Sequence, residues 1–88
     1  MPNVIIAHKV EDLDRWLGYK AERATVLSQF GSNVTDHVSM DGYPFISVSM
    51  DVPDVAALQA AVATPSPELA EAMQRHGVIP PLTFLIEK

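Results

Sequence analysis

The chain contains 88 residues, 48% of them hydrophobic and 19% charged, with a formal net charge of −5. This composition is typical of one globular domain, spanning residues 1–88, whose core is marginal in size without a partner subunit. The acidic charge and the lack of a basic run argue against nucleic acids and anionic membranes as partners, and the absence of cysteine excludes disulfides and thiolate chemistry.

The N-terminal segment and the hydropathy of the chain predict where the protein resides. The first residues, MPNVIIA, have no basic segment ahead of the apolar ones, so no secretory signal is expected. No stretch approaches the roughly 20 apolar residues that a membrane span requires. We therefore expect a cytoplasmic protein without a membrane partner. Because its core is marginal in size, we also expect it to associate with further copies of itself as a homodimer or a higher homo-oligomer.

The first predicted element is a strand over residues 3–9, NVIIAHK, which is short and rich in β-branched residues. Side chains alternate along a strand, and the alternation assigns Val4, Ile6 and His8 to one face and Ile5, Ala7 and Lys9 to the other. Both sets are largely apolar. This pattern is typical of a central strand covered on both sides.

A helix is predicted after this strand, with Asp12 as its N-cap and Gly31 as the residue that ends it. Its buried stripe keeps helical spacing and consists of Leu13, Trp16, Leu17, Lys20, Ala24 and Leu27, with the stem of Lys20 at the border of the stripe. A second stripe beside it consists of Tyr19, Arg23, Val26 and Phe30. Two interpretations of this second stripe remain: its residues are ordinary exposed side chains, or they contact a partner subunit. We interpret Trp16 and Tyr19 as core or interface groups rather than as a ligand platform.

A β-hairpin is predicted over residues 33–51. Asp41-Gly42 provides the turn residues, and Pro44 cannot donate a hydrogen bond to a neighbouring strand. The register that a three- or five-residue loop allows separates apolar from polar side chains better than the register of a two-residue loop does. It pairs Val38 with Ile46, His37 with Ser47, Asp36 with Val48, Thr35 with Ser49, Val34 with Met50, and Asn33 with Asp51.

The second helical region is predicted in two pieces. Asp54 caps the first piece and Ser66 the second, and Gly77 ends the second piece. His76 precedes this glycine, where a cation complements the helix dipole. The remaining residues are predicted as an extended connector over 78–81 and a last strand over 82–88.

The elements therefore follow the order β-α-β-β-α-β, which is the split βαβ arrangement of ferredoxin-like α+β folds. Right-handed crossovers place the four strands of an antiparallel sheet in the order 4-1-3-2. Both helical regions then cover the same face of the sheet. The opposite face is left without helices.

The two faces of this sheet differ in their predicted chemistry. The face under the helices is apolar and contains Ile5, Ala7, Val34, Val38, Met40, Ile46, Val48, Met50, Leu82, Phe84 and Ile86. The other face contains Val4, Ile6, His8, Thr35, His37, Ser39, Phe45, Ser47, Ser49, Thr83 and Leu85. Such a mixture of hydroxyl, imidazole and aliphatic groups is typical of the wall of a ligand cavity.

Two segments, HKVEDLDRW (residues 8–16) and SPELAEAMQRHGV (residues 66–78), and the pattern of the whole chain resemble the dimeric α+β-barrel superfamily. In that superfamily two ferredoxin-like sheets pack face to face and enclose a barrel. Its members include cofactor-free quinone-forming monooxygenases, muconolactone isomerases, polyketide cyclases, haem enzymes and proteins without a known reaction. The resemblance implies a homodimer. Because no catalytic motif of a subfamily is matched, it assigns no active-site residue.

His37 and His8 are the candidate catalytic residues, because an imidazole titrates near neutral pH and serves as a general acid or base. The candidate ligand-binding residues are Ser47, Ser49, Thr83, Thr35 and Phe45. A structural interpretation stays open for both histidines: His37 bonds Ser47 across the strands, and His8 faces solvent at a strand end. The two lie roughly 10 Å apart, or two inter-strand spacings, too far to share a metal ion. We expect neither a metal nor a cofactor.

The expected function is binding of a small hydrophobic or aromatic metabolite between two facing sheets, with cofactor-free conversion by an isomerase, cyclase or monooxygenase. The alternative is a non-catalytic ligand-binding or dimerisation module. A metabolite-sensing regulatory domain also fits the fold. An open cavity that holds His37 beside Ser47 favours the first function, whereas an interior filled by Phe45 and Leu85 favours the second.

Overall fold

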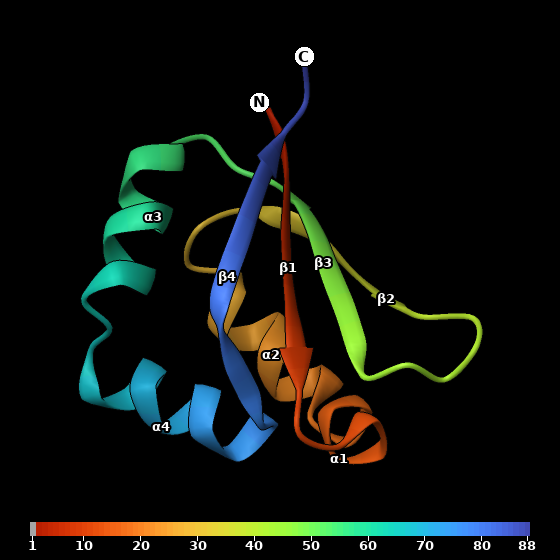
Figure 1. Ribbon diagram of the computed structural model, residues 1–88. Coiled ribbons are helices and arrows are strands. Elements are labelled where there is room, and N and C mark those ends of the chain that lie inside the picture. Colours follow the sequence, from red (N-terminus) through yellow and green to blue (C-terminus); the bar gives the residue numbers. More distant parts are fainter. Residues whose placement is uncertain (1) are drawn as a thin grey trace.

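The computed structural model describes residues 2–88 and shows the predicted order of elements, with both helical regions split in two (Figure 1). The elements in this range are β1 (Asn3–Val10), α1 (Leu13–Gly18), α2 (Lys20–Leu27), β2 (Ser32–Val38), β3 (Phe45–Asp51), α3 (Val55–Ala63), α4 (Pro67–His76) and β4 (Val78–Ile86). None of these helices is long and apolar enough to cross a membrane.

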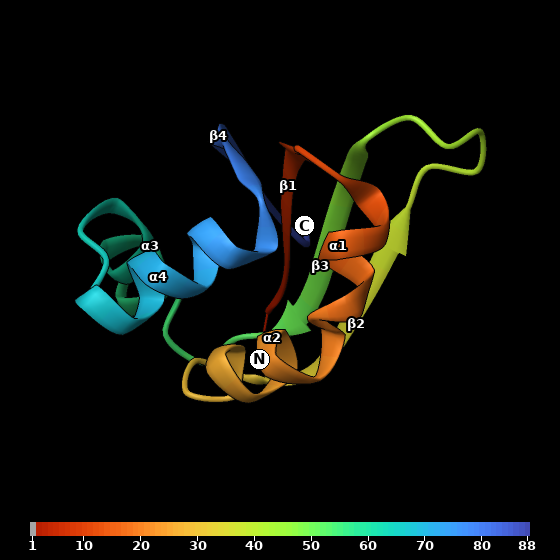
Figure 2. The ribbon, with the colours of Figure 1, turned by 90° about the horizontal axis from the view of Figure 1, so that it is seen from below.

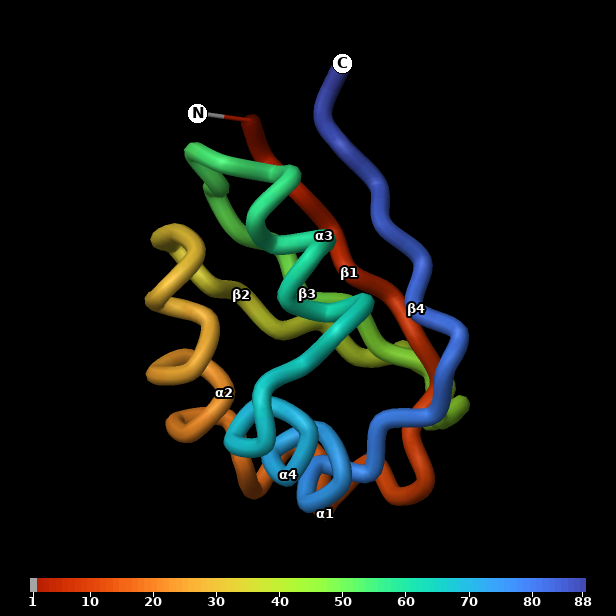
Figure 3. The backbone as a smooth tube through the Cα atoms, turned by 90° about the vertical axis from the view of Figure 1, so that its left-hand side faces the viewer, coloured from red at the N-terminus to blue at the C-terminus, as the bar shows by residue number. Residues whose placement is uncertain are grey.

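The four strands form one antiparallel sheet in the order β2-β3-β1-β4, as predicted. Figures 2 and 3 show the helices on a single side of this sheet, with α2 toward β2 and with α3 and α4 toward β4. We call the covered side the helix-side face; on β3 it carries Ile46, Val48 and Met50. The other side is the open face, which on β3 carries Phe45, Ser47 and Ser49. A site can be built on either face.

The register of the β2–β3 hairpin is confirmed over most of its length. The observed pairs are Val38 with Ile46, His37 with Ser47, Asp36 with Val48, and Thr35 with Ser49. The two outermost predicted pairs do not form, because the register shifts and Ser32 lies opposite Asp51. Asn33 lies in this irregularity with a φ of 56°, and its side chain donates a 2.7 Å hydrogen bond to Asp51. An asparagine tolerates this left-handed conformation better than most residues.

The predicted faces of β1 are inverted. Its directly opposed partners on β3 are Met50 for Val4, Val48 for Ile6, and Ile46 for His8. Opposed residues in a sheet share a face, so His8 belongs to the helix-side face and Ala7 to the open face. The prediction was wrong because both sets of β1 side chains are largely apolar, and alternation alone does not say which set faces the helices.

The predicted first helix is also arranged differently. It is broken at Tyr19, directly after Gly18, a poor helix former, and α2 ends at Leu27. The inward stripe consists of Trp16, Arg23, Val26, Leu27 and Phe30, so most of the predicted second stripe packs inward. Two residues predicted to be buried, Leu17 and Ala24, are exposed, as is Lys20, which was predicted at the border of the stripe.

Gly31 does not cap a helix, contrary to the prediction. The glycines with a positive φ are Gly42 and Gly77, and α2 has already ended before Gly31. A Cβ atom at Gly31 would collide with the backbone carbonyl of Asp51 in β3. The absence of a side chain therefore lets the chain that leaves α2 pass close to the sheet.

The last helix and strand follow the sequence signals more closely. The Ser66 side chain accepts a hydrogen bond from the N–H of Leu69, and Gly77 ends α4 in the left-handed conformation, as predicted. β4 begins at Val78 instead of Leu82, because the predicted connector also pairs with β1. Its irregularity surrounds the cis peptide bond of Pro80-Pro81.

Two apolar clusters fill the space between the sheet and the helices. The first contains Val4, Ile6, Met50, Val52 and Leu58. The second contains Val10, Trp16, Ile46 and Val48. Burial of each large apolar side chain contributes roughly 1.5–3 kcal/mol to stability. These clusters hold the helices over the sheet and form the walls of the pocket described next.

Candidate functional site

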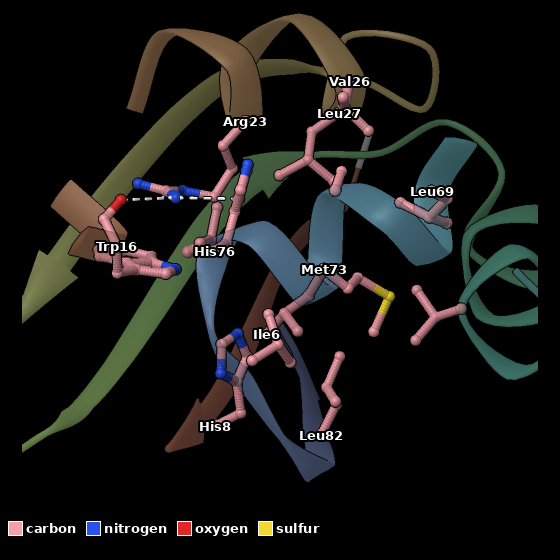
Figure 4. Close-up of a pocket in the computed structure, with 14 residues that line it drawn as sticks. Ile6, His8, Trp16, Arg23, Val26, Leu27, Leu69, Met73, His76 and Leu82 are labelled. Atoms are coloured by element: carbon pink, nitrogen blue, oxygen red, sulfur yellow. Dashed lines mark hydrogen bonds between the residues drawn. The ribbon is translucent and has the colours of Figure 1, made fainter. Parts of the chain in front are cut away.

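A pocket lies between the helices and the helix-side face (Figure 4). Its volume is about 80 Å³, and most of its wall is aliphatic or aromatic. Three side chains with titratable or cationic groups line it: His8 from β1, Arg23 from α2 and His76 from α4. Trp16 from α1 adds an indole N–H group. A largely apolar pocket with a few convergent polar groups is the usual form of a small-molecule site.

His8 presents a defined nitrogen to this pocket. The register of β1 and β4 shifts between Ala7 and Lys9, so His8 lies at the irregularity opposite the proline pair of β4. Its Nδ1 lies 2.8 Å from the backbone carbonyl oxygen of Lys9. Because a carbonyl only accepts, Nδ1 carries the proton, and in the neutral ring Nε2 carries the lone pair. Burial lowers the pKa of His8, which keeps the imidazole in this neutral form.

Trp16 is fully buried and holds an unsatisfied donor. Its backbone carbonyl accepts hydrogen bonds from the N–H of Tyr19, at 3.2 Å, and from Arg23 Nη1, at 3.0 Å. Its indole Nε1, by contrast, has no hydrogen-bond partner among residues 2–88. Figure 4 shows this nitrogen directed toward the interior of the pocket. Buried donors are normally paired, so an unpaired one inside a pocket requires an explanation.

Arg23 is held in place on all sides. Its guanidinium group forms a two-bond ion pair with Asp36 of β2, at 3.2 Å from Nε and 2.9 Å from Nη2. The side chains of Arg23 and Asp36 are both buried, with exposed fractions of 7% and 6%. The guanidinium carbon also lies 3.6 Å from the ring centroid of Trp16, a cation–π contact. Arg23 therefore fixes the indole ring and ties α2 to the edge of the sheet.

His76 completes the polar cluster from α4. Its Nδ1 lies 3.3 Å from Arg23 Nη1, which can only donate, so Nδ1 is the acceptor and Nε2 bears the proton. Nε2 lies 3.3 Å from Glu22, and the ring stacks on Tyr19 with centroids 4.9 Å apart. Burial, reinforced by Arg23, lowers the pKa of His76, although Glu22 opposes the shift. His76 is thus a neutral bridge between α4 and α2.

The hydrogen bonds of the cluster decide which groups can meet a ligand. Both nitrogens of His76 and three nitrogens of Arg23 have protein partners. Nε2 of His8 and Nε1 of Trp16 are the nitrogens of the cluster that have no such partner among residues 2–88, so one offers a lone pair and the other a proton. One is an acceptor that can take up a proton and the other is a donor. Such a pair suits a ligand that carries both an acidic hydrogen and an acceptor oxygen.

A second cavity lies beside the pocket. A volume of about 440 Å³ lies between α2 and the α3–α4 segment, and its wall shares Val26 and Leu69 with the first pocket. The inner pocket alone is smaller than a cavity of ~150 Å³ that holds benzene in a protein core. The two volumes together reach the ~300–1,000 Å³ of ligand sites. A ligand larger than benzene would need both volumes.

Most of the residues predicted to form a site lie on the open face, where they were predicted, and not in the pocket under the helices. Paired positions there form two rows across the sheet: His37, Ser47, Ala7 and Thr83 in one, and Thr35, Ser49, Ile5 and Leu85 in the other. His37, Ser47 and Phe45 meet at a shallow depression of about 290 Å³ at the hairpin end. Of the predicted site residues, His8 lines the pocket under the helices, on the opposite face of the sheet from the others.

The sequence reasoning did not identify Arg23, Asp36 and His76 as a cluster. A signal was present, since Arg23 belonged to an apolar helical stripe and Asp36 alternated onto the apolar face of the hairpin. Opposite charges on two inward faces predict a buried pair. His76 was assigned to the helix dipole, and nothing in its local sequence distinguishes that role from burial against α2.

Comparison with solved structures supports the fold. A crystal structure of an antibiotic biosynthesis monooxygenase aligns with 100% of this chain and 97% of its own, with a TM-score of 0.66 and 17% identity. A candidate antibiotic biosynthesis monooxygenase from Deinococcus radiodurans aligns with 100% and 91%, with a TM-score of 0.60 and 10% identity. No protein-family model and no curated protein matches the chain. The resemblance to α+β-barrel proteins is therefore confirmed at the level of the fold.

Proposed function

We propose that this protein removes a proton from a hydrophobic carbonyl compound in the pocket between the helices and the sheet, with His8 as the general base. The tautomer of His8 carries this proposal, because the bond to the carbonyl of Lys9 leaves Nε2 with a lone pair in a largely apolar pocket. Proton removal begins many isomerisations, cyclisations and cofactor-free oxygenations of activated carbon. Monooxygenase is also the activity named for two solved structures of this fold.

The proposed step is balanced without a cofactor. The bond between hydrogen and the carbon next to the carbonyl breaks, and Nε2 of His8 takes the proton. The electron pair forms a carbon–carbon double bond and places negative charge on the carbonyl oxygen. Return of the proton to another carbon gives an isomerase, and attack of the carbanion on a carbonyl gives a cyclase, whose alkoxide takes the proton. Addition of the carbanion to dioxygen, the oxidant, gives a peroxide anion that takes the proton. Loss of water with the second hydrogen of that carbon then leaves a carbon–oxygen double bond, which is the reaction of a monooxygenase.

Exchange of hydrogen for deuterium tests this step. 1-Indanone, an aromatic ketone with acidic hydrogens at C2, serves as the probe in D₂O, and proton NMR follows the loss of the C2 signal. We expect the protein to accelerate exchange over buffer, and His8→Gln to remove about a hundredfold or more of that acceleration. His37→Gln is the comparison, since His37 lies on the open face. Loss of exchange in His37→Gln but not in His8→Gln would overturn the assignment of the base.

The depression on the open face is the second candidate site. His37, Ser47 and Phe45 line it, and a second subunit would convert this shallow surface into an enclosed one. In that arrangement His37 is the proton-transferring residue, Thr83 lies in the same row across the sheet, and Thr35 and Ser49 lie in the adjacent row. The non-catalytic alternative is supported instead when neither histidine affects exchange and the protein does not exceed the buffer rate.

We also propose that two copies pair through their open faces. The two rows at the centre of this face carry hydroxyl, imidazole and apolar side chains but no carboxylate. A solvent-exposed sheet face normally carries more charged side chains. Leu85 and Phe45 are exposed there at 54% and 42%. Apolar patches rimmed by polar groups mark protein interfaces. Light scattering over a dilution series should give twice the 9.6 kDa chain mass, and a stable mass of one chain would contradict the dimer.

A further inference from the structure

We infer that the indole N–H of Trp16 is the oxyanion donor of this site: it donates to the carbonyl oxygen of the ligand and to the enolate oxygen formed from it. This inference rests on the proposed function for the reacting carbon, but the hydrogen bond itself requires only that the ketone binds. It narrows the ligand class to apolar molecules with an acceptor oxygen beside the acidic carbon. A hydrocarbon of the same shape would bind less well.

The burial of Trp16 is the first argument. Its side chain is fully buried, yet Nε1 has no hydrogen-bond partner in residues 2–88. Removing a donor from water without a replacement acceptor costs free energy. Trp16 lines the same pocket as His8, whose Nε2 supplies the lone pair of the proposed base. An acceptor oxygen on the ligand would satisfy the indole donor within the pocket that His8 also lines.

The rigidity of Trp16 is the second argument. The guanidinium carbon of Arg23 lies 3.6 Å from the indole centroid, and Asp36 fixes that guanidinium from β2. The backbone of Trp16 is held as well, because its carbonyl accepts from Arg23 and from the N–H of Tyr19. The N–H is therefore oriented before a ligand arrives. Donors fixed in advance stabilise developing negative charge without a cost of reorganisation.

The chemistry of proton removal is the third argument. A neutral imidazole is a weak base toward a carbon–hydrogen bond, and the burial that lowers the pKa of His8 weakens it further. The negative charge must therefore be stabilised on the oxygen as it forms. Four of the five N–H groups of Arg23 already serve Asp36, His76 and the Trp16 carbonyl. The indole nitrogen, by contrast, has no partner at all among residues 2–88, so its N–H is wholly available to a ligand.

The single tryptophan of the chain makes this hydrogen bond directly observable. In ¹⁵N-labelled protein its indole N–H gives one cross-peak. 1-Indanone and indane have the same bicyclic carbon skeleton and differ in the carbonyl oxygen. We expect 1-indanone to move the indole proton downfield, and indane to bind without that downfield shift. The same downfield shift should persist in His8→Gln, which keeps the donor and removes the base.

A variant extends the test to affinity. The preference for 1-indanone over indane is measured as the ratio of their two dissociation constants. We expect Trp16→Phe to lower this preference roughly fivefold, which is the effect of losing one hydrogen bond. A downfield shift without deuterium exchange would support the donor and overturn the proposed base. Exchange in a protein whose indole peak stays in place with saturating 1-indanone would overturn the donor and leave the base standing. The measurement on the unaltered protein decides the matter even when Trp16→Phe does not fold.

Discussion

Arg23 is the residue on which the polar part of the site depends. It bonds Asp36 on β2, the carbonyl of Trp16 on α1 and His76 on α4, so three elements meet at one guanidinium group. Removing one partner of a buried ion pair usually costs about 3–5 kcal/mol, because the other charge is left unpaired. The pair is therefore a positioning device for Trp16 and His76 whose loss would disturb the pocket and the fold together.

Two buried histidines make stability depend on pH. His8 and His76 have pKa values lowered mainly by burial, and Arg23 opposes a positive charge on either ring. In the unfolded chain both titrate near ~6.5. As the pH falls through that value, the unfolded chain binds protons that the native protein does not bind. The free energy of unfolding therefore falls with decreasing pH in this range.

We predict that urea melts at pH 7.5, 6.5 and 5.5 give a steadily lower free energy of unfolding. His8→Gln and His76→Gln should each reduce this dependence, since glutamine does not titrate. The groups that face His76 are Glu22, Arg75, Arg23 and Tyr19, and the chosen range stays above the titration of the carboxylate. A free energy of unfolding that is constant or rises toward pH 5.5 would contradict neutral, buried imidazoles.

At the scale of elements, the hairpin was predictable and β1 was not. An aspartate–glycine turn and strict alternation fixed the pairing of Val38 with Ile46 and of Thr35 with Ser49. In β1 both faces are apolar, so only contacts with β3 show that His8 lies under the helices. The open indole donor of Trp16 was likewise beyond prediction, because an unpaired hydrogen bond is a property of the assembled pocket.

The faces of β3 give a matched test of this arrangement. Val48 is 3% exposed beneath the helices, whereas the adjacent Ser49 lies on the open face. We predict that Val48→Lys lowers the free energy of unfolding by about 3 kcal/mol or more, because it buries an unpaired charge. Ser49→Lys should stay folded but convert the proposed dimer to a monomer of 9.6 kDa.

Circular dichroism melts and light scattering of the same two samples separate the outcomes. Unfolding of Ser49→Lys alone would mean that the two faces are reversed. A folded, dimeric Ser49→Lys protein would mean that the copies meet through another surface. The sequence predicted both the polar character of the open face and the need for a partner, but the pairing of copies is not a property that one chain displays.

At the scale of the whole molecule, a single chain already contains a pocket that holds both the proposed base and the proposed donor. β1 brings His8, α1 brings Trp16, and after the break at Tyr19 Arg23 of α2 reaches back to Trp16. The adjoining cavity between α2 and the α3–α4 segment provides the room for the rest of a ligand. The central claim is that ligands bind on the helix side of the sheet.

Methyl NMR with 1-indanone tests this claim most directly, because neighbouring residues report on opposite faces. Ile6 and Leu82 line the pocket under the helices, whereas Ile5 and Leu85 lie on the open face. We predict that saturating 1-indanone shifts the methyl signals of Ile6 and Leu82 and leaves those of Ile5 and Leu85 in place. Shifts confined to Ile5 and Leu85 would contradict the claim and place the ligand between two open faces.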